Sequence, residues 1–123
     1  MPTILVADDD QTISHLVAST LRRHGHTVVQ AFDAMQTVMY ALRAPHPDAI
    51  VLDIRMPGGT GLNALRKIRA SARTAAVPVV VLSGSTSEDE RAAVEALGVT
   101  ASLRKPVEPE ELLRAIDAAL GGG

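Results

Sequence analysis

The feature that most constrains the fold is a set of five short apolar runs along the chain, each five or six residues long. Several of these runs are apolar throughout instead of alternating with polar residues. Uniform apolarity over so short a length is typical of parallel strands that helices cover on both faces. The predicted strands are Thr3–Ala7, Thr27–Ala31, Asp48–Asp53, Pro78–Ser83 and Thr100–Arg104, of which the last has the weakest pattern.

The segments between these runs carry apolar residues at the spacing of an amphipathic helix. Asp10 and Asp33 stand where a helix N-cap is expected, and Gly25 and Gly98 stand where a left-handed helix stop is expected. The predicted helices are Gln11–His24, Ala34–Arg43, Gly61–Arg69, Ser87–Leu97 and Pro109–Leu120. Thr60 directly precedes the third of these helices, and Ser87–Glu90 at the start of the fourth matches a capping box.

The order of elements is therefore strand then helix, five times over. Right-handed crossover connections place the helices of such a chain on both faces of a twisted parallel sheet. We predict a doubly wound α/β fold with a five-stranded parallel sheet. Ligands of such folds bind outside the carboxyl ends of the strands.

Composition limits the classes of protein to which the chain can belong. A length of 123 residues suffices for one hydrophobic core. The 12 basic and 14 acidic residues give a formal charge of −2, with no basic face for nucleic acid and no polybasic segment for an anionic membrane. Cysteine is absent, and no apolar run reaches the ~18 residues of a membrane span. We therefore expect a single domain in a reducing, cytoplasmic setting.

Chemically active side chains stand at the ends of four predicted strands. Asp8 and Asp9 follow the first strand, Asp53 ends the third, Ser83 ends the fourth and Lys105 follows the fifth. Parallel strands place all of these ends on one edge of the sheet. We therefore expect carboxylates, a hydroxyl and an ammonium group to converge on one crevice.

Carboxylates held together in this way repel one another. At ~5 Å and an effective dielectric constant of ~20 each pair costs about 3 kcal/mol, so a cation is needed to stabilise the cluster. All the candidate ligands are hard oxygen atoms, which favours Mg²⁺ or Mn²⁺ over zinc or copper. Asp53, at the tip of the central strand, is a credible nucleophile, and Lys105 and Ser83 can contact phosphoryl oxygens. The pattern predicts phosphoryl transfer to a carboxylate.

Four stretches of the chain, ILVADDD, DAIVLDIRMPGGTGL, VVVLSGS and LRKPVEPEEL, resemble in sequence and in order the motifs of bacterial response-regulator receiver domains. The resemblance covers essentially the whole chain and implies the flavodoxin-like strand order 2-1-3-4-5 with five helices. It implies a receiver domain over residues 1–120, followed by a glycine tail at 121–123. It also implies a signalling domain that catalyses only its own phosphorylation and dephosphorylation.

The same resemblance implies partners and a metal site. A histidine kinase or a histidine phosphotransfer protein would donate the phosphoryl group to Asp53. Asp9 and Asp53 would bind Mg²⁺ directly, Asp8 would act largely through a metal-bound water, and the backbone carbonyl of Arg55 would be a further ligand. A homodimer through the last helix and strand is an option that the resemblance leaves open.

The resemblance further assigns the groups that contact the phosphoryl group. Ser83 would contact it and draw its loop inward, and Lys105 would pair with it. The bond between Lys105 and Pro106 would be cis. The segment Met56–Gly61 would form a flexible loop beside the site.

Two positions depart from the family pattern. Receivers usually carry Tyr or Phe three positions before the motif lysine, and here that position is Ser102. We therefore expect phosphorylation to be intact and its readout at the fourth helix, fifth strand and fifth helix to be altered. Arg55 stands two residues after the phosphoacceptor, where the side chain influences phosphate lifetime in this family. Its cation is expected either to shield the acyl phosphate or to pair with Asp9 or Asp10.

Two other classes of protein share part of this pattern. A phosphatase that passes through an aspartyl phosphate would place a second Asp two residues after the nucleophile, where this chain has Arg55. A flavodoxin-like cofactor binder would need a phosphate loop rich in Ser, Thr and Gly after the first strand, where this chain has DDDQ. Arg55 therefore disfavours the phosphatase class, and DDDQ disfavours the flavodoxin-like cofactor binder.

Overall fold

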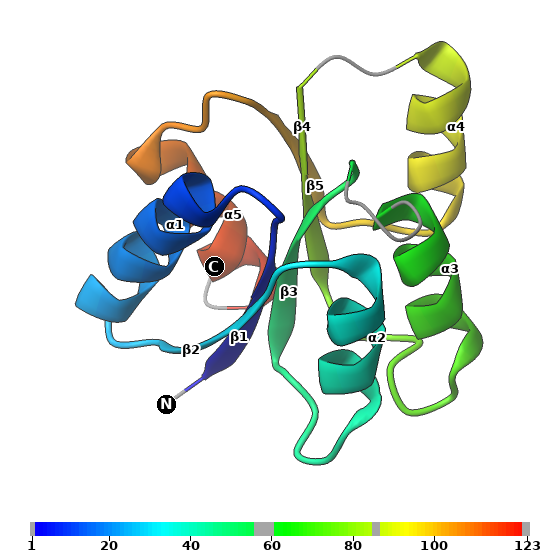
Figure 1. Ribbon diagram of the computed structural model, residues 1–123, viewed down its shortest axis with the longest axis horizontal. Helices are drawn as coiled ribbons and strands as arrows, with labels where there is room; N and C mark the ends of the chain where they lie inside the picture. Colours follow the sequence, from blue (N-terminus) through cyan, green and yellow to red (C-terminus); the bar gives the residue numbers. More distant parts are fainter. Residues whose placement is uncertain (1, 56–60, 85–86, 122–123) are drawn as a thin grey trace.

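The computed structural model describes residues 2–55, 61–84 and 87–121 and contains one sheet of five parallel strands (Figure 1). The strand order is β2-β1-β3-β4-β5, so the predicted doubly wound α/β fold and its order 2-1-3-4-5 are confirmed. The predicted and observed strand boundaries differ by at most one residue. The strands are β1 (Thr3–Ala7), β2 (Thr27–Ala31), β3 (Ala49–Asp53), β4 (Val79–Ser83) and β5 (Ala101–Arg104).

Five helices cover the two faces of this sheet (Figure 1). Two of them, α1 and α5, lie on one face, and the other three lie on the opposite face. None of the helices within the described residues is long and apolar enough to cross a membrane. The helices are α1 (Gln11–Arg23), α2 (Ala34–Leu42), α3 (Gly61–Ala70), α4 (Glu88–Ala96) and α5 (Pro109–Ala119).

The central strands are apolar throughout because both of their faces are buried. In β1, Ile4 and Val6 pack with α1 and α5, whereas Leu5 and Ala7 pack with α2, α3 and α4. Every residue of β3 is buried. The alternation of side chains along a strand thus supplies two separate cores.

The edge strand β5 explains why the fifth apolar run is the weakest. Ala101 and Leu103 pack against the core beneath α5, while Ser102 and Arg104 are exposed on the other face. Helix α4 buries Val94 alone, so it covers this end of the sheet sparsely. An alternating pattern is what a strand buried on one face requires.

Side chains cap three helices as the sequence predicts. The carboxylates of Asp10 and Asp33 accept hydrogen bonds from the backbone N–H groups of Ile13 and Gln36, at 3.1 and 2.7 Å. The Ser87 hydroxyl likewise accepts from the Glu90 N–H at 3.1 Å. Gly25 and Gly98 both have positive φ, +87° and +71°, which only glycine adopts freely. Thr60 lies outside the described residues.

Arg69, at the end of α3, ties this helix to the base of two neighbouring elements. Its guanidinium donates to the carbonyls of Thr74 and Val77, which precede β4, at 3.3 and 2.6 Å. It also donates to the carbonyls of Leu97 and Gly98, after α4, at 2.8 and 3.3 Å. Partial burial lowers the pKa of Arg69. The sequence does not predict this role of Arg69.

The start of α3 approaches the end of β3 very closely. The Gly61 N–H donates to the carbonyl of Ile54 at 2.7 Å. A Cβ atom at Gly61 would meet the carbonyl oxygen of Asp53 and would lie 2.7 Å from the Cα of Ile54. Only glycine fits here, because real side chains do not approach backbone atoms so closely.

Candidate phosphoacceptor site

Four strands deliver the predicted site residues to one edge of the sheet. Asp53 and Ser83 are the last residues of β3 and β4, and Asp8 and Lys105 directly follow β1 and β5. Backbone hydrogen bonds continue the ladder beyond the strand ends, since the Lys105 N–H donates to the Ser83 carbonyl at 2.8 Å. The sheet therefore fixes the backbone positions of these residues.

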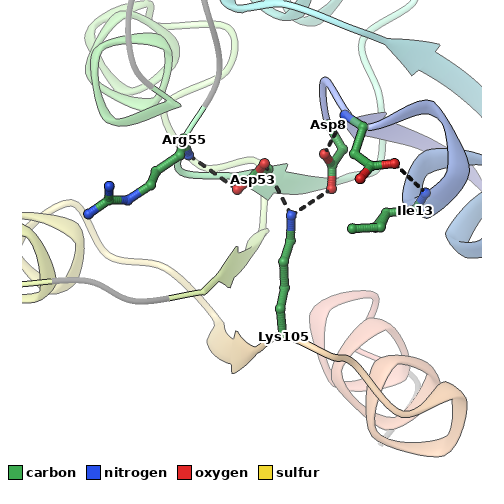
Figure 2. A network of polar contacts seen from close by, with 6 residues as sticks. Asp8, Ile13, Asp53, Arg55 and Lys105 are labelled. Atoms are coloured by element: carbon green, nitrogen blue, oxygen red, sulfur yellow. Dashed lines mark hydrogen bonds and ion pairs between the residues drawn. The ribbon is translucent and has the colours of Figure 1, made fainter.

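Lys105 lies between two buried carboxylates (Figure 2). Its Nζ is 3.0 Å from Oδ2 of Asp8 and 3.2 Å from Oδ2 of Asp53. Asp8 is 1% exposed and Asp53 is 4% exposed. Burial opposes the charge on Lys105, but the hydrogen bond to Asp8 and the two carboxylate charges outweigh it and raise the pKa of the lysine. The three groups form one charged cluster with a single excess negative charge.

The second oxygen of each carboxylate accepts a backbone N–H. Oδ1 of Asp8 accepts from the Asp10 N–H at 2.9 Å, and Oδ1 of Asp53 accepts from the Arg55 N–H at 3.1 Å. These bonds set the direction in which the carboxylates point. Both Oδ2 atoms consequently turn toward Lys105 (Figure 2).

Asp9 completes a group of three carboxylates. Asp9 is exposed, and one oxygen atom each from Asp8, Asp9 and Asp53 lies within 4.8 Å of the others. All three donors are hard oxygen atoms, as Mg²⁺ prefers. The residues thus fit the divalent cation that the sequence predicts.

The pKa of Asp53 is raised to about 6 from an ordinary value of 3.8, chiefly by burial. The Asp8 carboxylate also acts to raise this pKa, while the Arg55 N–H and Lys105 act to lower it. Burial and a nearby like charge destabilise the ionised form of a carboxylate, whereas a bound cation stabilises it. The electrostatics therefore agree with the metal site.

Arg55 does not pair with Asp9 or Asp10, so that alternative is wrong, and shielding of the acyl phosphate stays a prediction. Its side chain points away from Asp53 (Figure 2), and Nη2 lies 3.2 Å from Oε1 of Glu90 in the first turn of α4. The first turn of α4 carries Glu88, Asp89 and Glu90, and this concentration of negative charge attracts an exposed cation. The sequence predicts Glu90 only as part of a capping box and gives no sign that it is the partner of Arg55.

Ser102 lines a cavity of about 280 Å³ between α4 and β5, together with Ser83, Val94 and Leu103. Neither aromatic ring of the chain fills this space. Phe32 makes an edge-to-face contact with His15, with ring centroids 6.3 Å apart, and the Arg43 guanidinium lies over the ring of Tyr40. Phe32 directly follows β2, at the opposite edge of the sheet from β5. Ser102 therefore borders a cavity that neither aromatic ring of the chain occupies.

The remaining predictions at the site have mixed outcomes. The Lys105–Pro106 bond is cis, as predicted, and the Ala44–Pro45 bond, which the sequence analysis did not single out, is also cis. Of the predicted loop Met56–Gly61, residues 56–60 lie outside the described residues. Within the part of the chain that the structure describes, no hydrogen bond joins the Ser83 side chain to the carboxylates, so its role stays a prediction.

Comparisons with known proteins agree with this geometry. Residues 4–117 match the family model described as response regulator receiver domain. Protein PilH of Pseudomonas aeruginosa is 35% identical over 122 residues, which are 99% of this chain and 100% of PilH. The phosphate regulon transcriptional regulatory protein PhoB of Escherichia coli K12 is 32% identical over 117 residues, 95% of this chain but only 51% of PhoB.

A solved structure of a receiver domain is similar over nearly the whole chain. The receiver domain of the sensor histidine kinase PA1611 of Pseudomonas aeruginosa has a TM-score of 0.88 and 30% identity, with 98% of each chain covered. That structure has a magnesium ion coordinated in its active-site cleft. The match supports the receiver over the phosphatase and flavodoxin-like alternatives. This chain belongs to the response regulator receiver domain family, the signalling domains of two-component systems.

Proposed function

We propose that Asp53 is the phosphoacceptor of this receiver domain. The observation that carries the proposal is the position of its carboxylate, buried at the tip of the central strand and 3.2 Å from the Lys105 ammonium. A carboxylate oxygen of Asp53 would form a bond to phosphorus while the bond from phosphorus to a donor imidazole nitrogen breaks. Positioning and charge neutralisation supply most of the catalysis in such transfers.

The three carboxylates support a divalent cation at this site. Asp8, Asp9 and Asp53 would hold Mg²⁺, and Mn²⁺ fits the same donors; the backbone carbonyl of Arg55 is the further ligand that the family implies. When bound, the ion neutralises charge that develops on the phosphoryl oxygens. The burial of Asp8 and Asp53 makes this neutralisation effective, since the surroundings screen charge weakly.

Lys105 and Ser83 are the remaining phosphoryl contacts that we propose. Lys105 supplies a positive charge that is already beside Asp53, so little reorganisation precedes the transfer. Ser83 ends the neighbouring strand β4 and would donate its hydroxyl hydrogen to a phosphoryl oxygen. Pro106 fixes the backbone directly after the lysine. The same groups would serve the hydrolysis of the aspartyl phosphate by this domain itself.

We further propose that the readout of phosphorylation is altered at α4, β5 and α5. The cavity beside Ser102 supports this, because no ring of this chain is available to move into it. Comparison of amide NMR spectra of apo and beryllofluoride-bound protein tests the proposal. Small shifts in β5 and α5 are expected, and a large displacement of that whole face would contradict it.

The partners remain at the level of the family. A histidine kinase or a histidine phosphotransfer protein would donate the phosphoryl group, and a downstream effector would receive the signal. Four other expectations stay predictions. They are a receiver domain over residues 1–120 with a glycine tail at 121–123, a cytoplasmic location, the lack of nucleic-acid binding through this domain, and a homodimer through α5 and β5.

Intact-protein mass spectrometry tests the central proposal. Acetyl phosphate with Mg²⁺ should add the mass of one phosphoryl group to the wild type and none to Asp53→Asn. The matched control is Asp10→Asn, which removes a neighbouring exposed carboxylate and keeps the helix cap. Labelling of Asp53→Asn, or no labelling of the wild type under conditions that label a known receiver, would show that Asp53 is not the acceptor.

A further inference from the structure

A groove of about 590 Å³ lies between α2 and α3, and its lining includes none of Asp8, Asp9, Asp53, Ser83 and Lys105. Its walls come from one side of each helix. Met35, Val38 and Met39 supply the α2 wall, and Ala64, Arg66 and Lys67 contribute to the α3 wall. Nothing in the proposed phosphoryl chemistry uses these residues.

The α2 wall is apolar and exposed. Met35 is 79% exposed and Met39 is 50% exposed. Five large apolar side chains are exposed among the described residues, and three of them, Met35, Met39 and Leu42, lie on α2. Exposed apolar side chains gathered on one helix mark an interaction surface, and methionine adapts its shape to a partner.

The α3 wall is cationic, and no Asp or Glu is among the described residues that line the groove. Arg66 and Lys67 are exposed, and neither α2 nor α3 contains an Asp or Glu. This contrasts with the chain as a whole, whose formal charge is −2, and with the first turns of α4 and α5, which carry acidic residues. Arg66 donates through Nη1 to Oδ1 of Asn63 at 3.2 Å, which holds its guanidinium along the groove. An anionic occupant is therefore favoured.

We propose that this groove binds an acidic amphipathic helix of a partner protein. Two parallel walls of helix side chains suit a third helix better than an extended strand, because side chains at helical spacing interdigitate with them. From Ala34 to Met39 the apolar wall rises about 8 Å, enough for two apolar anchors at i and i+3 or i+4. Asp or Glu beside these anchors would pair with Arg66 and Lys67.

NMR titration of ¹⁵N-labelled protein with a synthetic peptide tests the proposal. The probe is a helical peptide of about four turns, with Leu at i, i+3, i+4 and i+7 and Asp or Glu elsewhere. A second peptide carries Lys at each acidic position. The acidic peptide should bind about tenfold or more tightly than the basic one, with shift changes concentrated in α2 and α3.

Two double variants locate the binding site. Met35→Gln with Met39→Gln removes apolar surface at nearly constant shape, and Arg66→Glu with Lys67→Glu reverses the charge of the α3 wall. Both should weaken binding about tenfold or more. The matched control, Arg23→Glu with Arg73→Glu, changes two exposed cations elsewhere by the same net charge and should bind like the wild type. Unchanged dispersion of the amide spectra verifies that each variant is folded.

Three results would overturn the proposal. The first is equal affinity for both peptides, and the second is shift changes centred outside α2 and α3. The third is a dimer in sedimentation experiments that dissociates on Met35→Gln with Met39→Gln, because a second copy of the chain would then cover the groove.

Discussion

Arg55 and Glu90 form an ion pair that joins the residue two positions after Asp53 to the first turn of α4. Nη2 of Arg55 lies 3.2 Å from Oε1 of Glu90, and the two side chains are 63% and 32% exposed. The pair thus links the proposed phosphoacceptor loop to a helix that buries only Val94. An exposed pair of this kind contributes little to stability, yet it determines where the guanidinium lies.

The first prediction is that Glu90 acts on the aspartyl phosphate through Arg55. Glu90→Gln frees the guanidinium, so the half-life of the phosphorylated protein should change. The same substitution in an Arg55→Ala background should have no effect, because the group that it releases is gone. Phosphate release after removal of the donor measures both rates. An equal effect of Glu90→Gln in the two backgrounds would show that Arg55 is not the intermediary.

The second prediction concerns Asp53 and pH in the absence of divalent ions. Its folded-state pKa of about 6 exceeds the ordinary value of 3.8, so the folded state binds more protons than the unfolded state between these two values. Stability should therefore fall as pH rises through this window, by at most about 3 kcal/mol for this group. Asp53→Asn should remove this dependence and should be more stable than the wild type above about pH 7.

Urea unfolding of wild type and Asp53→Asn across the window checks this difference, with Asp10→Asn as the exposed control. Mg²⁺ should stabilise the wild type near neutral pH, and the effect should shrink as pH falls below about 6, since protons then compete with the ion. Parallel pH profiles of wild type and Asp53→Asn would contradict the assignment of this ionisation to Asp53.

The third prediction concerns Lys105. Lys105→Met keeps most of the aliphatic stem but leaves two buried carboxylates, Asp8 and Asp53, without their cation. The metal-free variant should lose about 3 kcal/mol at neutral pH, because a buried charge without its partner is costly. Mg²⁺ should restore part of this loss. The matched control is Lys67→Met, an exposed lysine on α3, and a loss of similar size there would refute the electrostatic explanation.

The fourth prediction concerns Arg69, which donates to four backbone carbonyls. Arg69→Met should lower the free energy of unfolding by about 3 kcal/mol, since several bonds from a charged donor are lost and carbonyls are left without partners. Arg69→Lys should recover only part of this, because an ammonium group cannot span the same carbonyls. Arg66→Met, exposed on the same helix, should change stability by less than about 0.5 kcal/mol in urea unfolding.

The fifth prediction concerns Gly61. Gly61→Ala should cost about 2 kcal/mol, because its methyl group would meet the backbone of Asp53 and Ile54. Gly84→Ala is the matched control, since a Cβ there meets nothing within 4 Å. Chemical shifts of Asp53 in the folded fraction should also move. A neutral Gly61→Ala variant would mean that α3 can retreat from β3 without loss.

The sequence predicts the fold well where local pattern and burial agree. Strands β1 and β3 are apolar throughout because each serves two cores, and the caps at Asp10, Asp33 and Ser87 act through neighbouring residues. Such information is local, so it can be read along the chain. The positions of Asp8, Asp53 and Lys105 follow from parallel pairing, which brings strand ends together.

Contacts between distant side chains could not be predicted in the same way. Pairing of Arg55 with Asp9 or Asp10 was one of two alternatives, yet its partner Glu90 lies 35 positions along the chain. Arg69 contacts carbonyls on two separate connections, and a carbonyl carries no signature in the sequence. The exposure of Met35 and Met39 on α2 could not be predicted either, because helical spacing does not reveal which apolar side chains a neighbouring helix fails to cover.

The bonds of Arg69 have one further consequence for α4. They fix the carbonyls of Leu97 and Gly98 just beyond the carboxyl end of the helix, while the amino end has the exposed contact of Glu90 with Arg55. A helix that is fixed at one end moves mainly by rotating about that end. The largest travel of α4 would then occur at Glu88, the end nearer Ser83 in the chain, and the smallest at Ala96.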